Sequence, residues 1–242
     1  MSEHISKQFD AELEAVRTRV LQMGGLVEEQ IVNAIDGLTG GNMETIDLVI
    51  GSDHRVNACE VELDESCSQI IAKRQPAAGD LRLIIAIIKT ITDLERIGDE
   101  AKKIGRMAKL IHAAERLHMP RLELKHVANL AIAMLRKALD AFARLDSKAA
   151  AEVVRQDELV DDEFRSILRQ LITFMMEDPR TITRSLEILF VAKALERIGD
   201  HSKNMAEYVV YMIEGRDVRH IRDNSGDSAK ARDPLESRQA GG

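Results

Sequence analysis

The 242-residue chain has no tryptophan, two cysteines and four prolines, and aromatic residues make up only 3% of it. Cys59 and Cys67 lie on one predicted helix, roughly 12 Å apart at the standard helical rise, which is too far for a disulfide. The chain contains no Cys-x-x-Cys pair. Two isolated thiols are typical of a protein in a reducing cytoplasm and give no indication of redox chemistry.

Long apolar runs and an excess of basic residues are also lacking. The most apolar run, residues 83–88, is far shorter than the roughly 20 residues of a membrane-spanning helix. The net charge of −7 argues against a nucleic-acid-binding protein, because phosphate contacts require clustered Lys and Arg. The polar start of the chain does not resemble a signal peptide. We therefore expect a cytoplasmic protein that reaches a membrane only through a partner.

The residues that are abundant favour long helices. Hydrophobic residues make up 45% of the chain and charged residues 31%, and Leu, Ile, Ala, Glu, Lys and Arg dominate, which are good helix formers. Apolar residues recur at spacings of three and four, and Gly and Pro clusters interrupt them. The helices predicted from this pattern cover residues 5–38, 42–74, 80–117, 120–145, 147–177 and 180–215.

These six helices predict an all-α fold of two pseudo-symmetric three-helix bundles. We expect the first bundle at residues 1–118 and the second at 119–215. Residues 216–242 are rich in Gly, Ser, Asp and Arg and contain almost no apolar anchors. This composition is typical of a disordered tail.

The feature that organises the chain is an exact internal repeat. The sequence Leu-Glu-Arg-Ile-Gly-Asp occurs at residues 94–99 and again at 195–200, 101 positions later. Such a repeat indicates two copies of one supersecondary unit. In each copy the Glu and the Asp are four residues apart and share one helix face. The resulting carboxylate pairs are Glu95 with Asp99 and Glu196 with Asp200.

The sequence alone does not decide whether these carboxylates are buried. Counting back from Glu95, the same helix face carries Ile91, Ile88, Ile84 and Leu81. The opposite face is also apolar, with Leu94, Ile97, Ala101 and Ile104. If the core lies on that second side, the acidic residues are at the surface.

A second acidic helix precedes each copy of the motif. In the first half its polar residues are Asp53, Asn57 and Glu60, and in the second half they are Asp157 and Asp161. A shift of 104 positions maps Asp53 onto Asp157 and Asn57 onto Asp161. If consecutive helices pack antiparallel, each half brings two acidic turns together.

Oxygen-only ligand sets of this kind suit hard cations such as magnesium, manganese or calcium, and carboxylates also bind iron. Zinc is a further candidate. The alternative is that the acids are solvated and pair with nearby residues of their own helix, Asp99 with Lys103 and Asp200 with Lys203 or Asn204. His201 and His220 have no second metal-binding side chain at metal-ligand spacing, and we expect both at the surface.

The sequence resembles the PhoU family of bacterial phosphate-uptake regulators. The resemblance rests on the duplicated motif, on residues 74–76 (Arg-Gln-Pro) with 80–82 (Asp-Leu-Arg), and on residues 23–26 (Met-Gly-Gly-Leu). It extends from about residue 9 to 215. The resemblance implies two three-helix bundles whose Glu/Asp-x-x-x-Asp motifs bind metal clusters. In this chain the motifs fall on Glu95 with Asp99, Asp157 with Asp161 and Glu196 with Asp200. Asp53 is followed by Asn57 where the pattern has a second carboxylate, and nearby Glu60 is a possible substitute.

The resemblance also implies a function without catalysis. Members of the family are adaptors between the ATPase subunit of the phosphate transporter and the sensor histidine kinase of the phosphate two-component system. They repress phosphate-starvation genes when phosphate is plentiful. A homodimer is expected because of the extent of uncovered helical surface.

Two other readings compete with a regulator. The pairs Glu115 with His118 and Glu123 with His126 have the Glu-x-x-His spacing of di-iron bundles, which would indicate an enzyme. However, they flank Pro120 at the end of a helical hairpin and have basic neighbours, so solvated side chains are the simpler reading. The second alternative is a helical scaffold that binds ions only for its stability.

Overall fold

The computed structural model describes residues 2–113 and 122–215, and the side chains of 7–52, 54–113 and 122–215. These residues form long α-helices and one short 3-10 helix, η1, and they contain no strand. The elements are α1 (Ser2–Gly40), α2 (Met43–Arg74), α3 (Ala78–Ala113), α4 (Leu124–Arg144), α5 (Ser147–Glu177), η1 (Pro179–Thr181) and α6 (Ile182–Glu214). The all-α prediction and its six helices are confirmed.

Local sequence signals set several of the helix ends. The side chain of Asn42 accepts hydrogen bonds from the backbone N–H groups of the first turn of α2. Asp146 caps α5 in the same way. In both cases a side-chain oxygen satisfies N–H groups that have no partner within the helix. The helix expected to begin at Pro120 begins at Leu124 instead.

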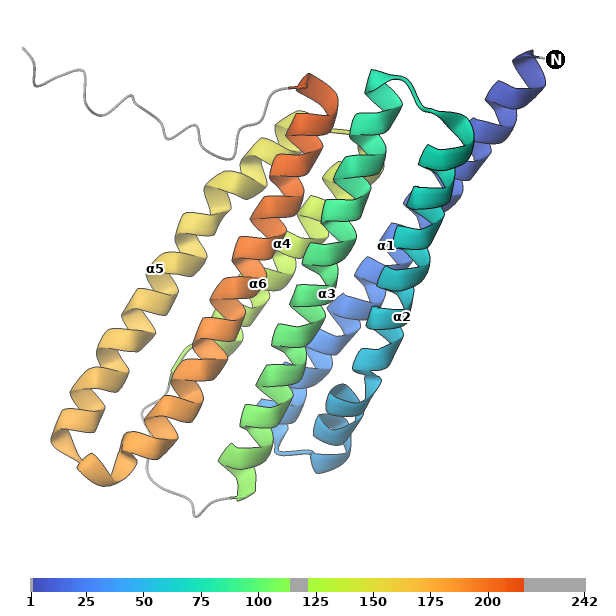
Figure 1. Ribbon diagram of the computed structural model, residues 1–242. Helices are drawn as coiled ribbons and strands as arrows, with labels where there is room; N and C mark the ends of the chain where they lie inside the picture. The colour runs from blue at the N-terminus through green and yellow to red at the C-terminus, as the bar shows by residue number, and fades with distance from the viewer. Residues whose placement is uncertain (1, 114–121, 216–242) are drawn as a thin grey trace, which may run out of the picture.

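The helices run roughly along one direction, with α3 and α6 side by side in the middle of the molecule (Figure 1). The first three helices pack on one another, as do the last three, and each set forms a three-helix bundle. The contact between α3 and α6 is the most extensive of all the helix contacts. The two motif-bearing helices therefore join the two halves of the molecule.

This central position explains why α3 is apolar on more than one face. Leu94, Ile97 and Ile104 are fully buried, and so is Ile84 on the side that carries Glu95. Because α3 contacts α1, α2 and α6, both of its apolar stripes are covered. The apolar residues of both sides are therefore buried, whereas Glu95 is half-buried and Asp99 is exposed.

The halves also meet where α1 crosses α4. A Cβ atom added to Gly24 would lie 2.6 Å from a methyl carbon of Leu139, whereas one added to Gly25 would contact nothing. A larger residue here would require the side chain of Leu139 to shift, so glycine permits this close approach. The Gly-Gly pair therefore marks a close helix contact.

Three expectations fall partly on residues that the structure does not describe. The proposed boundary between residues 118 and 119, the tail 216–242 and His220 all lie outside the described ranges. None of the described helices is both long and apolar enough to cross a lipid bilayer.

Candidate metal-binding sites at the repeated motif

The two copies of the motif lie next to each other where α3 and α6 pack side by side. His201, directly after the second copy, makes a 2.7 Å contact from its Nδ1 to an oxygen of Asp93, directly before the first. Arg197 of the second copy pairs at 2.7 Å with Glu100, directly after the first. Asp93, Glu100 and His201 are all buried. The repeat therefore forms the contact between the halves.

The glycine of each copy brings an acidic helix close to the motif. A Cβ added to Gly98 would lie 3.4 Å from a methyl group of Val56 on α2. One added to Gly199 would lie 3.4 Å from a methyl group of Val160 on α5 and 3.7 Å from an oxygen of Asp157. The same contact thus occurs twice, at the positions related by the repeat. A Cβ at either glycine would already be in van der Waals contact with the acidic helix, so the two helices approach closely at the motif.

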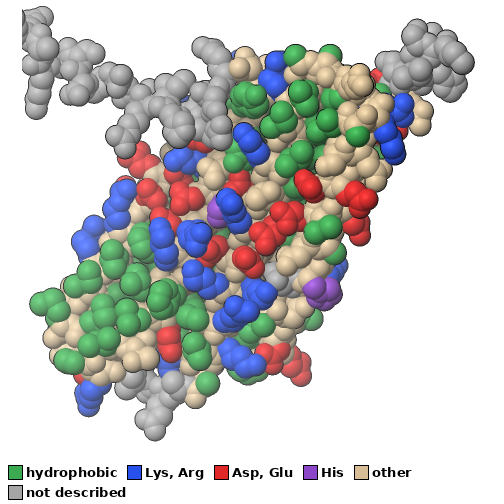
Figure 2. Space-filling view, in the orientation of Figure 1, with side chains coloured by type: hydrophobic (Ala, Val, Ile, Leu, Met, Phe, Trp, Pro, Cys, Tyr) green, Lys and Arg blue, Asp and Glu red, His purple; other side chains and the backbone are tan. Residues whose placement is uncertain are grey.

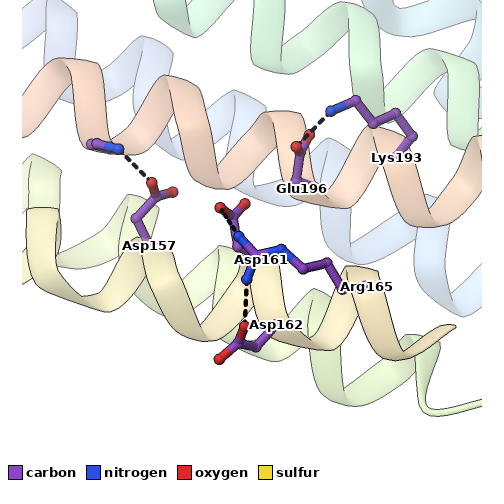
Figure 3. Close-up of polar contacts among 7 residues, drawn as sticks. Asp157, Asp161, Asp162, Arg165, Lys193 and Glu196 are labelled. Carbon is purple, nitrogen blue, oxygen red and sulfur yellow. Dashed lines mark hydrogen bonds and ion pairs between the residues drawn. The ribbon is translucent and has the colours of Figure 1, made fainter. Parts of the chain in front are cut away.

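The second half brings four carboxylates together from two helices. Asp157 and Asp161 lie on α5 and Glu196 lies opposite them on α6 (Figure 3). Asp200 follows one turn after Glu196. Burial raises the pKa of Asp200 from 3.8, and the charges of Glu196, Asp157 and Asp161 add to this, so that it reaches about 6. Because all three charges act on Asp200, the four carboxylates share one electrostatic environment.

Basic side chains of the same chain already bind these carboxylates. The ion pairs are Lys203 with Asp157 at 2.6 Å, Lys193 with Glu196 at 2.5 Å, and Arg165 with Asp161 at 3.2 Å. Burial by itself lowers the pKa of Lys203, but the hydrogen bond and charge of Asp157 outweigh it, and the pKa is raised. The three cations partly neutralise the site.

The first half has a weaker version of this arrangement. Asn57 of α2 has a buried side-chain oxygen without a hydrogen-bond partner. Glu60 and Glu95 are partly exposed, and Asp99 is exposed. The side chain of Asp53 is not described. The first half therefore has an amide and an exposed carboxylate at the positions where the second half has Asp161 and the half-buried Asp200.

Comparison with known proteins decides the family. The family model described as the PhoU domain matches residues 20–108 and 124–209. The chain is 48% identical over 223 residues to a Pseudomonas aeruginosa protein named phosphate-specific transport system accessory protein PhoU homolog, covering 91% of each chain. It is 47% identical over 222 residues to the Escherichia coli protein named phosphate-specific transport system accessory protein PhoU, again covering 91% of each chain.

The chain belongs to the PhoU family. Solved PhoU structures have the same fold. The crystal structure of PhoU from Pseudomonas aeruginosa matches with a TM-score of 0.82 at 46% identity, covering 86% of this chain and 100% of that one. The structure of the phosphate transport system regulatory protein PhoU from Streptococcus pneumoniae matches with a TM-score of 0.81 at 28% identity, covering 87% and 99%.

The second-half residues of this PhoU protein fit a hard cation in their chemistry. All four side chains offer oxygen, and one oxygen of Glu196 is buried without a hydrogen-bond partner. A buried acceptor without a donor is costly, and a cation would satisfy it. In the conformation described, however, no group of three or more Asp, Glu, His and Cys side chains within residues 7–52, 54–113 and 122–215 converges closely enough to hold a metal ion. A bound metal would therefore have to displace the basic side chains that now occupy the carboxylates.

The structure corrects the pairing expected for solvated acids. Lys203 binds Asp157 across the helix pair rather than Asp200 on its own helix. In the first half Lys103 binds Glu100 rather than Asp99.

His201 was also misplaced by the sequence, because it is buried against Asp93 rather than exposed. Asn204, expected beside Asp200, points its amide nitrogen at Asp93 across a long 3.4 Å contact. The sequence signal that could have found these contacts is that Asp93 and Glu100 interrupt an otherwise apolar side of the helix.

The di-iron reading finds no support in its described half. His126 is 54% exposed, and its Nε2 lies 3.9 Å from an oxygen of Glu163, a neighbour on α5. Its spacing partner Glu123 is also exposed. The other pair, Glu115 with His118, lies outside the described residues.

Proposed function

We propose that this PhoU protein is a cytoplasmic, non-catalytic accessory protein of phosphate-specific transport. The observation that carries this proposal is the extent of its likeness to proteins bearing that name, 47% identity over 91% of both chains for the one from Escherichia coli. The likeness includes both halves of the molecule, and with them the central α3–α6 contact built from the duplicated motif. The likeness therefore covers both bundles and not one of them alone.

Within this role the protein is an adaptor and a negative regulator. It links the ATPase subunit of the phosphate transporter to the sensor histidine kinase and represses starvation genes in rich phosphate. The net charge of −7 suits basic surfaces on these partners. It meets the membrane only through them, and it acts as a homodimer.

Deletion of the gene tests the regulatory part. Expression of phosphate-starvation genes and phosphate uptake should rise in the deletion strain even in rich medium, and the intact gene should restore repression. A deletion strain in which these genes stay repressed contradicts the proposal. Affinity capture at high and low phosphate should recover the transporter ATPase and the kinase with the wild-type protein.

The second part of the proposal is that the acidic turns bind divalent or ferric cations. Asp157, Asp161, Glu196 and Asp200 would hold the ion in the second half, and its positive charge would stabilise four carboxylates that now repel one another. The first half has an amide, Asn57, in place of one carboxylate and offers less charge. We therefore expect tighter binding in the second half.

Metal titration by calorimetry tests this part. The variant Glu196→Gln/Asp200→Asn should lose the tighter binding event and keep the weaker one. The matched variant Glu95→Gln/Asp99→Asn should do the reverse. A chelator should lower the melting temperature of the wild type, because a ligand of the folded state stabilises it. Identical titrations of the wild type and both variants would place bound ions elsewhere.

A further inference from the structure

The outer side of the α5–α6 hairpin carries an apolar face that the fold itself leaves uncovered. It consists of six residues, which we call the hairpin face: Leu168, Ile172 and Met176 on α5, and Ile182, Leu186 and Phe190 on α6. Five of them are 40–79% exposed, and Leu168 is half-buried. Figure 2 shows hydrophobic side chains gathered over this end of the two helices. Contiguous exposed apolar surface of this kind indicates an interaction site.

The internal repeat provides a control for whether the bundle needs these residues. A shift of 104 positions relates α5 to α2 and places Asp64, Ser68 and Ala72 at the positions of the three α5 residues. All three are exposed on α2, which packs on α1 and α3 as α5 packs on α4 and α6. The first bundle thus forms with two polar residues and an alanine at these positions. On α5 the apolar character of the hairpin face is therefore not needed for the bundle to form, whereas on α6 the positions related by the 101-residue shift are Leu81, Ile85 and Lys89, two of which are apolar as well.

The charges around the hairpin face are balanced. Between residues 162 and 193 the chain has five acidic and five basic residues. Most of these form ion pairs within this region, such as Arg165 with Asp162 and Arg180 with Asp178. The whole chain carries −7, so all of its net charge lies outside this region. An anionic membrane requires a basic excess for electrostatic attraction, and an oppositely charged protein partner requires a net charge of either sign. The face offers neither.

A second copy of the chain requires neither a basic excess nor an opposite net charge on this face. Two copies would repel each other through most of their surface, but not through a neutral one. On each helix the exposed residues recur at every fourth position, which forms the ridges that pack between helices. Two antiparallel helices that present such ridges can pack against an identical pair across a twofold axis, as in a four-helix bundle.

We propose that the hairpin face is the contact surface of the homodimer. This assignment rests on the proposed self-association and adds where it takes place. The dimer joins the second bundles of two chains, and Phe190 and Met176 are its most exposed apolar anchors. The first bundle, with its polar α2 surface, stays at the outer ends of the dimer.

Sedimentation velocity at micromolar concentration tests the assignment. The variant Met176→Asp/Phe190→Asp should sediment as a monomer where the wild type is a dimer. The control is Val61→Asp on α2, which also places a charge at an exposed apolar position, 65% exposed, and should remain dimeric. Helical circular dichroism and melting temperature verify that all variants fold, and a dimeric double variant that is folded overturns the hairpin face.

A second experiment does not depend on disruption. In a Cys59→Ser background, Leu186→Cys should form an intermolecular disulfide under mild oxidation, because residues near a twofold axis approach their own copies. Val61→Cys should remain monomeric on a non-reducing gel. If the wild type itself sediments only as a monomer, self-association and this assignment both fail, while the role in phosphate transport is untouched. If purified transporter ATPase then binds the wild type but not the double variant, the face belongs to that partner.

Discussion

The raised pKa of Asp200 leads to a quantitative prediction about stability. In the unfolded chain this carboxyl ionises near its usual 3.8, whereas in the folded protein its pKa is about 6. Between these values the folded state holds a proton that the unfolded state has released. The free energy of unfolding therefore decreases as pH rises from about 4 through 6, and the full penalty is present at neutral pH.

The size of the penalty follows from the displacement of the pKa. Each unit by which the pKa is displaced corresponds to about 1.4 kcal/mol, so the loss of stability at neutral pH has an upper limit of about 3 kcal/mol. Because Asp200 is only partly buried, solvent screening reduces this value, and we expect about 1–1.5 kcal/mol. The variant Asp200→Asn cannot ionise and should be more stable than the wild type by that amount at pH 7.5. At pH 4.5 the gain should largely disappear.

Urea denaturation followed by circular dichroism measures this difference. Both proteins are unfolded at pH 4.5 and 7.5 with a chelator present, so that bound cations do not contribute. The matched control is Asp99→Asn at the position related by the repeat, where the side chain is exposed and the change should stay within about 0.5 kcal/mol at both pH values. Equal effects of Asp200→Asn at the two pH values, or a loss of stability at pH 7.5, would refute the raised pKa of Asp200.

Three further predictions concern the contacts between helices. Gly24→Ala should destabilise the protein by about 1–2 kcal/mol, because its Cβ would overlap the side chain of Leu139. Gly25→Ala should be neutral or stabilise the protein by up to about 1 kcal/mol through helix propensity. Thermal melts of the two variants show whether α1 and α4 touch here. Asp93→Ala should lower the free energy of unfolding by about 2 kcal/mol, since it leaves the buried ring nitrogen of His201 without its partner. If urea denaturation shows no loss, this contact does not stabilise the fold. The variant Lys203→Met should bind divalent cations more tightly in calorimetric titrations, because the metal no longer has to displace an ammonium group from Asp157. The affinity should rise roughly tenfold for each 1.4 kcal/mol of competition removed. An unchanged affinity would mean that the lysine and the metal do not compete.

The sequence by itself determined the helices, most of their ends and the relation between the halves. Helix periodicity, the caps at Asn42 and Asp146 and the breaks before α3 and α6 are local, so one chain is enough to read them. The duplicated motif indicated two copies of one unit and paired Gly98 with Gly199, and the shift of 104 positions between α2 and α5 relates Val56 to Val160. The structure has the same contact at both places.

Only the tertiary structure decided what the charged residues contact. A central helix that is apolar on several sides has the same periodicity whichever neighbour covers each side, so the sequence could not place Glu95 relative to the core. The pairing of Asp93 with His201 depends on α3 and α6 packing side by side, and that of Asp157 with Lys203 on the distance between α5 and α6. Such pairs join residues far apart in the chain, and no local pattern records them. The sequence did separate the two acidic sites, because Asn57 stands where the second half has Asp161, but it could not show that Lys203 of α6 pairs with Asp157 of α5.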